Sequence, residues 1–175
     1  MELYYHSPIG IIVIEGEGRG VRSCSFFKGK ALKTEERTGQ NSLPDSAPPA
    51  LKEAWRQLDE YFKGLRTAFS VPLDLRGTEF QKRVWAELRR IPFGETRSYG
   101  WIARACGRPG AARAVGGANN KNPVVIFVPC HRVVGADGSL TGFGGGLWRK
   151  RWLLEHEKKV LADAAQDVYK NIRKP

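Results

Sequence analysis

The strongest constraint on the fold is a change in hydrophobic pattern near residue 76. In residues 1–27, β-branched and aromatic residues are interrupted by glycines at positions 10, 16, 18 and 20. This pattern is typical of short antiparallel strands joined by tight turns. Beyond residue 76 the apolar residues recur at helical spacing. The sequence therefore predicts an α+β (α/β) protein, with a small N-terminal α/β domain over residues 1–76 and a mainly helical C-terminal domain over residues 77–175.

The remainder of the first domain contains no recognisable functional motif, and we expect this domain to have a supporting role. Residues 34–50 are polar and contain prolines, which indicates a surface loop. Residues 51–62 place their apolar side chains on one helical face, and residues 71–75 (VPLDL) suit a short strand or an extended link.

The second domain opens with a clear helix start. Thr78 and Gln81 have the spacing of a capping box, and Pro92 and Gly94 end the helix that begins there. Two further short helices are expected over residues 98–106 and 111–118, joined by a tight turn. Two helices in this arrangement predict a helix-turn-helix, here within a winged-helix-like domain.

The positive charge lies almost entirely in the second domain. The chain has a formal net charge of +11; residues 1–76 contain 11 Lys and Arg against 10 Asp and Glu, and residues 77–175 contain 18 against 8. Such a distribution is typical of a surface that binds a polyanion, because cations that neutralise phosphates release counterions. General solubility is the alternative explanation of the charge.

The helix expected over residues 111–118 is unusually rich in small residues. Among them only Arg113 has a long side chain. Small residues such as Ala112 and Gly116 would let the helix backbone approach the floor of a DNA groove, with the arginine projecting. A close contact with another helix would explain the same composition.

The cysteines and the hydropathy argue against disulfide-bonded, metal-binding and membrane-spanning proteins. Cys24, Cys106 and Cys130 form no C-x-x-C pair and the chain has three histidines, so neither disulfides nor a metal site are expected. Residues 1–7 lack a charged head followed by an apolar run, and no stretch approaches the roughly 18 apolar residues of a membrane span. We expect a cytoplasmic protein, nuclear if the organism is a eukaryote, without a membrane partner.

The chemistry is expected around Cys130. Residues 124–128 (VVIFV) are typical of a buried strand that would deliver Cys130 and His131 at its end. Alone, Cys130 suits an inert core thiol, and adjacent side chains on a strand point to opposite faces, so a direct contact with His131 is not implied. A turn or a bridging water would be needed. The glycine-rich loop over residues 141–146 suits either a flap over a flat ligand or a simple connector.

Three sequence motifs resemble those of one family. AARAVGGANNKNP (111–123), VPCHRVV (128–134) and GGLWRKRWLLEHE (145–157) are similar to motifs of the O6-alkylguanine-DNA alkyltransferases, and the resemblance covers residues 78–157, about half of the chain. It implies a DNA repair protein that flips O6-alkylguanine out of duplex DNA, in the minor groove, and transfers the alkyl group to its own cysteine. The transfer would be irreversible, so each molecule would act once and need no cofactor.

The resemblance also implies the roles of individual residues. Cys130 would be the alkyl acceptor, activated through a water by His131, which Glu157 would orient, and Asn122 would brace the segment before Cys130. Since an ordinary thiol is only a few per cent ionised at neutral pH, it needs such a relay. Without the resemblance, Glu157 would be read as a solvated carboxylate at a helix end.

Further implied contacts concern the extruded base. Arg113 would fill the space that the base leaves, and Tyr99 would crowd the phosphate and donate its hydroxyl to guanine N3. The carbonyls of Cys130 and Val133 would accept from the guanine amino group, and the Gly144 N–H would reach O6. Taken alone, Arg113 suits a phosphate contact and Tyr99 an ordinary surface aromatic.

Two pocket positions depart from the family pattern. Phe143 stands where a tyrosine is frequent, and Asn119 where a methionine is common. The N-terminal cysteines and histidines that hold zinc in some members have no counterpart. The sequence leaves three points open: the preferred size of the adduct, the preference between O6-alkylguanine and O4-alkylthymine, and cooperativity on DNA. We expect a monomer.

Three other classes of protein share some of these sequence features. An alkyltransferase-like protein binds alkylated bases without removing them, but has another residue in place of the cysteine. A transcription regulator would use the helix-turn-helix as a sequence-specific, dimeric major-groove binder. A Cys-His hydrolase would turn over repeatedly.

Overall fold

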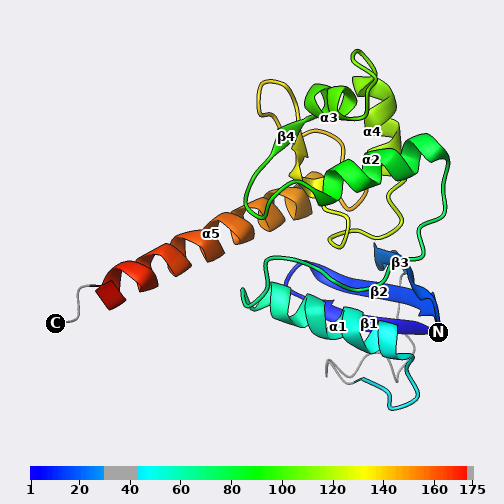
Figure 1. The fold of residues 1–175 in the computed structure, drawn as a ribbon. Coiled ribbons are helices and arrows are strands. Elements are labelled where there is room, and N and C mark those ends of the chain that lie inside the picture. Colours follow the sequence, from blue (N-terminus) through cyan, green and yellow to red (C-terminus); the bar gives the residue numbers. More distant parts are fainter. Residues whose placement is uncertain (30–42, 173–175) are drawn as a thin grey trace.

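The N-terminal part is a three-stranded sheet covered by one helix. A computed structural model describes residues 1–29 and 43–172. Strands β1 (Glu2–Ser7), β2 (Gly10–Glu17) and β3 (Gly20–Phe26) form an antiparallel meander, and helix α1 (Pro49–Phe62) lies across one face of it (Figure 1). Alternate strand residues such as Leu3 and Tyr5 are buried beneath the helix. The predicted antiparallel strands are confirmed.

The predicted helix over residues 51–62 is also confirmed, and it begins two residues earlier, at Pro49. A proline is favourable in the first helical turn because its missing N–H would have had no partner there. Residues 34–42 of the predicted loop lie outside the described residues. The stretch over residues 71–75 is an extended link that makes one parallel bridge, between Val21 and Leu73.

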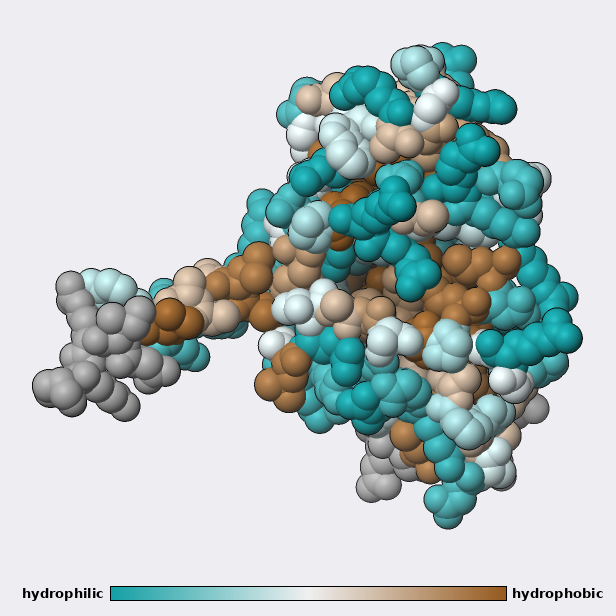
Figure 2. Space-filling view, in the orientation of Figure 1, coloured by the Kyte–Doolittle hydropathy of each residue, from teal (hydrophilic) through white to brown (hydrophobic). Residues whose placement is uncertain are grey.

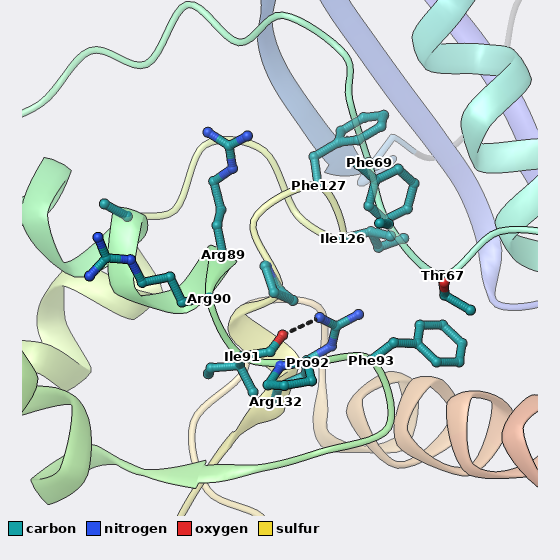
Figure 3. Close-up of a pocket in the computed structure, with 13 residues that line it drawn as sticks. Thr67, Phe69, Arg89, Arg90, Ile91, Pro92, Phe93, Ile126, Phe127 and Arg132 are labelled. Atoms are coloured by element: carbon teal, nitrogen blue, oxygen red, sulfur yellow. Dashed lines mark hydrogen bonds between the residues drawn. The ribbon is translucent and has the colours of Figure 1, made fainter.

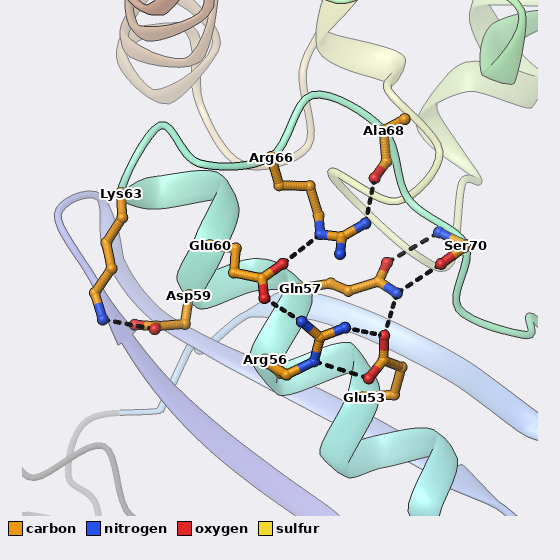
Figure 4. Close-up of polar contacts among 9 residues, drawn as sticks. All are labelled: Glu53, Arg56, Gln57, Asp59, Glu60, Lys63, Arg66, Ala68 and Ser70. Carbon is orange, nitrogen blue, oxygen red and sulfur yellow. Dashed lines mark hydrogen bonds and ion pairs between the residues drawn. The ribbon is translucent and has the colours of Figure 1, made fainter.

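A polar network fixes the chain that leaves α1 (Figure 4). The buried Gln57 side chain donates to the Ser70 hydroxyl and accepts from the Ser70 backbone N–H, both at 2.9 Å. Arg66 forms an ion pair with Glu60 at 2.6 Å. These contacts tie the link between the two parts of the chain to the helix.

The C-terminal part is built from helices. Helix α2 (Glu79–Arg89) starts at the predicted capping box, in which Thr78 and Gln81 each accept from the other's backbone N–H. Strand β4 (Arg97–Ser98) leads into α3 (Tyr99–Ala105), and a turn joins α3 to α4 (Ala112–Asn120). The two predicted short helices are thus confirmed, with ends shifted by up to two residues. Helix α2 packs against α4, where Trp85 donates to the Ala118 carbonyl at 2.9 Å.

The segment over residues 124–128 corrects the sequence prediction, because it is a buried turn and not a strand. Ile126 has a φ of 74°, which breaks the extended backbone. The turn is closed by the Val128 N–H, which donates to the Val124 carbonyl at 3.0 Å. Cys130 therefore lies at the start of a short 3-10 helix, η2 (Cys130–Arg132), rather than at the end of a strand.

The two parts of the chain meet at this turn. The Cys24 backbone in β3 accepts from Val125 and donates to the Pro123 carbonyl, both at 2.8 Å. After η2, strand β5 (Val133–Val134) pairs in parallel with β4. The edge of the N-terminal sheet thus supports the segment that carries Cys130.

The first half of the last helix, α5 (Leu147–Ile172), contributes buried side chains to the interior, among them Lys150, Leu153 and Glu157. Its C-terminal half projects from the body of the molecule (Figure 1), and Figure 2 shows hydrophobic and hydrophilic side chains along that projection. The helical structure expected for the end of the second domain thus extends as far as residue 172. Within the described ranges, none of the helices combines the length and apolar character needed to cross a membrane.

Candidate functional site

Cys130 lies at a small cavity between the two parts of the chain. It is 3% exposed and lines a hollow of about 140 Å³. The remaining lining residues come from β3 and its C-terminal extension, the end of α4, the buried turn and the glycine-rich loop: Ser25, Phe26, Lys28, Asn119, Asn120, Asn122, Val125, Phe143, Gly144 and Gly145. Of the predicted site residues, Asn122, Phe143 and Gly144 thus share this cavity with the cysteine.

The Cys130 thiol is protonated at neutral pH in this environment. Burial raises its pKa to about 11, although a hydrogen bond with Asn122 and the charge of Lys150 act in the opposite direction. A buried thiol of this kind is a poor nucleophile until its proton is removed. The site therefore needs a base.

His131, the next residue along the chain, is the candidate for that base. It is fully buried, and its Nε2 lies 2.7 Å from Oε1 of Glu157. Burial lowers the pKa of the imidazole, against the opposing effect of Glu157, so the ring is neutral at pH 7. Because an ionised carboxylate can only accept, the proton of the neutral ring is on Nε2 and Nδ1 carries the lone pair. Nδ1 has no hydrogen-bond partner among the described residues.

Glu157 is buried within α5 and is not a solvated carboxylate at a helix end. Burial alone would raise its pKa, but the charges and hydrogen bonds of His131 and Arg132 outweigh burial and hold the pKa far below its usual range. The carboxylate also accepts from the Tyr61 hydroxyl and the Gly94 N–H, both at 2.9 Å. Its geometry is therefore fixed from four sides.

Arg132 is a part of this network that the sequence reasoning missed. Its Nε donates to Oε2 of Glu157 at 3.0 Å, and its Nη1 donates to the Ile91 carbonyl at 2.7 Å. The guanidinium neutralises the buried carboxylate, so that Glu157 can stay ionised without the histidine becoming cationic. An arginine directly after the predicted Cys-His pair was the available signal.

Asn122 and Asn119 hold the backbone on either side of the cysteine. The Asn122 amide donates to the Val128 carbonyl at 2.8 Å, and its Oδ1 accepts from the Val124 N–H at 3.1 Å, which closes the buried turn. Asn119 donates to the Cys130 carbonyl at 3.4 Å. The bracing position implied for Asn122 is consistent with these contacts.

Two donors meet at one carbonyl of the glycine-rich loop. The Thr141 carbonyl accepts from the Tyr99 hydroxyl at 3.0 Å and from Nζ of Lys150 at 2.6 Å. Lys150 is fully buried, and burial lowers its pKa to about 8. The hydroxyl that was expected to reach a guanine is thus engaged with the loop in this structure.

The remaining predicted residues lie on α4 and β5. The Arg113 side chain is exposed, and neighbouring Ala112 is partly buried. Gly116 faces the Tyr99 ring, since a Cβ at that position would be 3.9 Å from its Cε1. Val133 is buried in β5. Their predicted contacts with DNA or with guanine stay predictions.

A larger cavity lies elsewhere between the two parts of the chain (Figure 3). It measures about 400 Å³, and Phe69, Arg89, Phe93, Phe127 and Pro129 are among its lining residues. The described residues that line it include none of the predicted site residues. We therefore place the chemistry at the smaller cavity, where the thiol is. No group of three or more potential metal ligands was found in the part of the chain that the structure describes.

Comparison with known families gives two matches that together span most of the chain. Residues 1–75 match the 6-O-methylguanine DNA methyltransferase ribonuclease-like domain, and residues 79–159 match the DNA binding domain of the same methyltransferase.

Individual relatives agree with these matches. A methylated-DNA–protein-cysteine methyltransferase of Mycobacterium tuberculosis is 53% identical over 152 residues, which cover 87% of this chain and 88% of the relative. A protein of the same name from Methanosarcina acetivorans is 49% identical over 156 residues, covering 87% of this chain and 95% of the relative. The crystal structure of Mycobacterium tuberculosis OGT in complex with DNA superposes with a TM-score of 0.77 at 50% identity, covering 90% of this chain and 92% of that one.

Proposed function

The chain belongs to the 6-O-methylguanine DNA methyltransferase family, and on that premise we propose that it repairs DNA by transferring the alkyl group of O6-alkylguanine to its own Cys130. The observation that carries the proposal is a protonated thiol that lines a cavity, followed in the chain by a neutral histidine whose Nδ1 has no hydrogen-bond partner among the described residues. This combination favours a cysteine alkyltransferase over a protein that only binds alkylated bases.

The chemical step begins with removal of the thiol proton. A water between Sγ and Nδ1 of His131 carries the proton to the imidazole, and Glu157 stabilises the imidazolium that forms. The thiolate attacks the alkyl carbon, a C–S bond forms and the C–O6 bond breaks. The electron pair of the broken bond goes to guanine, which takes up a proton. Because the thioether has no leaving group that water can displace easily, each molecule reacts once.

The alkylated base has to leave the duplex before the thiol can reach it. Extrusion costs a few kcal/mol, and less when the adduct has weakened base pairing. A cavity of about 150 Å³ holds a benzene-sized group, so the 140 Å³ hollow admits a single ring as it stands. We propose that the glycine-rich loop opens to admit the purine and that Gly144 and the Val133 carbonyl then bind it.

Loop opening is linked to the role proposed for Tyr99. When the loop moves, the Tyr99 hydroxyl loses its bond to the Thr141 carbonyl and becomes free to donate to guanine N3. Lys150 binds the same carbonyl and limits how far the loop moves. Substrate entry thus exchanges one hydrogen bond of the tyrosine for another.

DNA binding is proposed for the α3–α4 face. Exposed Arg113 would fill the vacated position in the stack, while Ala112 and Gly116 allow the helix to approach the minor groove closely. The excess of positive charge in residues 77–175 supports phosphate contacts. The protein would act in the cytoplasm as a monomer, with double-stranded DNA as its partner.

The test is a stoichiometry experiment. The protein is incubated with excess duplex oligonucleotide that carries O6-methylguanine labelled in the methyl group, and protein-bound label is counted over time. We expect one label per molecule, with none added by a second portion of substrate. Repeated turnover would indicate a hydrolase, and binding of the oligonucleotide without transfer would indicate an alkyltransferase-like binding protein.

A further inference from the structure

One wall of the Cys130 cavity comes from the N-terminal part of the chain. Ser25, Phe26 and Lys28 line the cavity together with the cysteine and the glycine-rich loop. Phe26 is the last residue of β3 and is 5% exposed. Its ring meets Phe143 edge to face, with centroids 6.2 Å apart. The two rings therefore face one cavity from two different parts of the fold.

Close packing leaves the Phe26 ring little freedom. A Cβ on Gly145 would lie 2.6 Å from ring carbons of Phe26 and 2.8 Å from Cε1 of Phe143, so only glycine fits between the rings. The backbone of the loop thus passes directly against both phenylalanines. A larger group inside the cavity has to displace this packing.

Arg149, in the first turn of α5, contacts both Phe26 and the glycine-rich loop. Its guanidinium lies 4.5 Å from the ring centroid of Phe26 and 4.5 Å from that of Trp148. Nε donates to the Ile9 carbonyl and Nη1 donates to the Gly145 carbonyl, both at 2.7 Å. One side chain therefore joins the β1–β2 turn, Phe26 and the glycine-rich loop.

The bonding of Arg149 is specific to a guanidinium. It contacts carbonyl oxygens and aromatic faces, and none of the ion pairs found among the described residues includes it. A planar guanidinium can stack flat on a ring while two different nitrogens donate to two separate carbonyls, whereas a lysine ammonium has no plane and a single nitrogen. The position thus requires the shape of arginine in addition to its charge.

We infer that Phe26 limits the size of the O6-alkyl group that Cys130 accepts, and that Arg149 is a positioning residue that holds Phe26 and the loop in the size-limiting arrangement. The inference rests on the proposed function and deepens it by assigning adduct specificity to the N-terminal part. Because a hollow of 140 Å³ admits only a single ring, an alkyl group larger than methyl has to press on the Phe26–Phe143 pair once the purine also occupies the cavity.

The test compares rates of transfer from duplexes that carry O6-methylguanine and O6-benzylguanine. In Phe26→Leu we expect the benzyl-to-methyl rate ratio to rise about 10-fold, the discrimination that a small volume change in an apolar pocket can give. The ratio of the two rates is the measurement, and the methyl rate alone decides nothing. Phe27→Leu is the matched control, because Phe27 packs against Tyr4, with centroids 6.1 Å apart, and does not line the Cys130 cavity.

Arg149→Lys tests the positioning role. We expect the benzyl-to-methyl rate ratio to rise, as in Phe26→Leu. Because both substitutions relax the same wall of the cavity, the ratio in the double variant should be little higher than in either single variant. Arg151→Lys, at an exposed position of the same helix, should leave the ratio unchanged. Additive effects of the two cavity variants would overturn the positioning role.

The outcomes separate the inference from the proposed function. If the wild-type protein transfers neither group, the proposed function fails. If it transfers methyl, and the ratio in folded Phe26→Leu stays constant or falls, or both rates fall equally, Phe26 has no size-limiting role.

Discussion

His131 and Glu157 are 26 positions apart in the sequence, and their side chains meet at 2.7 Å in the protein interior. Glu157 is ionised and holds the proton of the histidine on Nε2, so that Nδ1 is the basic atom. In the proposed mechanism this relationship lets a thiol with a raised pKa react at neutral pH, and it makes both the transfer rate and the stability depend on the pair.

Replacement of Glu157 by glutamine should slow methyl transfer by at least about 100-fold, because an orienting carboxylate in such a set contributes up to about 10⁴. Single-turnover kinetics with a methylated duplex measure the effect. Stability should also fall, by about 3–5 kcal/mol, since Arg132 would be left buried without its anion. Glu155→Gln, at an exposed position of α5, is the control. An unchanged transfer rate in a folded Glu157→Gln protein would refute the role.

The pH dependence of transfer should reflect the buried histidine. Because the folded-state pKa of His131 lies below the usual 6.5, the base stays neutral as the pH falls through that value. We expect the transfer rate to be constant down to pH 6.5 and to decline only below it. A rate that already declines well above pH 6.5 would contradict a lowered histidine pKa.

Stability should decrease in acid for the same reason. Unfolded His131 binds a proton at a higher pH than the folded residue, so acidification below 6.5 favours unfolding. Glu157 has a depressed folded-state pKa; its contribution is present above the usual 4.5 and is lost as the pH falls towards the folded value. Thermal melts across this range should show a falling Tm. In His131→Gln, the decrease in Tm that begins near pH 6.5 should be absent. If the Tm of this variant depends on pH as in the wild-type protein, His131 is not the cause of that decrease.

Arg113→Ala should impair repair of duplex DNA more than repair of single strands. Only the duplex needs a side chain to fill the position that the base vacates. The ratio of the two transfer rates is the measurement, with Lys159→Ala as a variant that loses the same charge from α5. Equal losses on both substrates would mean that Arg113 is only a phosphate contact.

Tyr99→Phe should slow transfer from duplex DNA about fivefold, the equivalent of one hydrogen bond of about 1 kcal/mol. The same change removes the bond to the Thr141 carbonyl and should lower the free energy of unfolding by a similar amount. Rates and denaturant unfolding measure the two effects. A stability loss with an unchanged rate would assign the hydroxyl to the loop alone.

Local signals in the sequence predicted a large part of this fold. The capping box at Thr78 and Gln81 requires only residues three positions apart, and it located the start of α2 correctly. The glycine-interrupted N-terminal segment likewise predicted the meander. These elements depend on neighbours along the chain, which a single sequence displays.

The turn before Cys130 could not be predicted in the same way. Five consecutive apolar residues are compatible with any backbone that is buried on all sides, so their pattern carries no period. The structure resolves the ambiguity through distant contacts, since the Cys24 carbonyl binds Val125 and the Asn122 side chain closes the turn. A β-branched residue at positive φ, as at Ile126, is also rarely expected.

The contribution of Phe26 to the site was missed for a related reason. Strand alternation predicts which residues share a face of the sheet but not that the end of β3 meets the glycine-rich loop more than a hundred residues later. Arg132 and Lys150 were likewise visible in the motifs, whereas their burial depends on tertiary packing.

The central claim is tested most directly by mass spectrometry of the protein after reaction with an O6-methylguanine duplex. We predict that the intact mass rises by one CH2 group, that peptide mapping places it on Cys130 rather than on the buried Cys24 or Cys106, and that Cys130→Ser gains nothing. A methyl group on another residue, or restored guanine with an unmodified protein, would contradict the account.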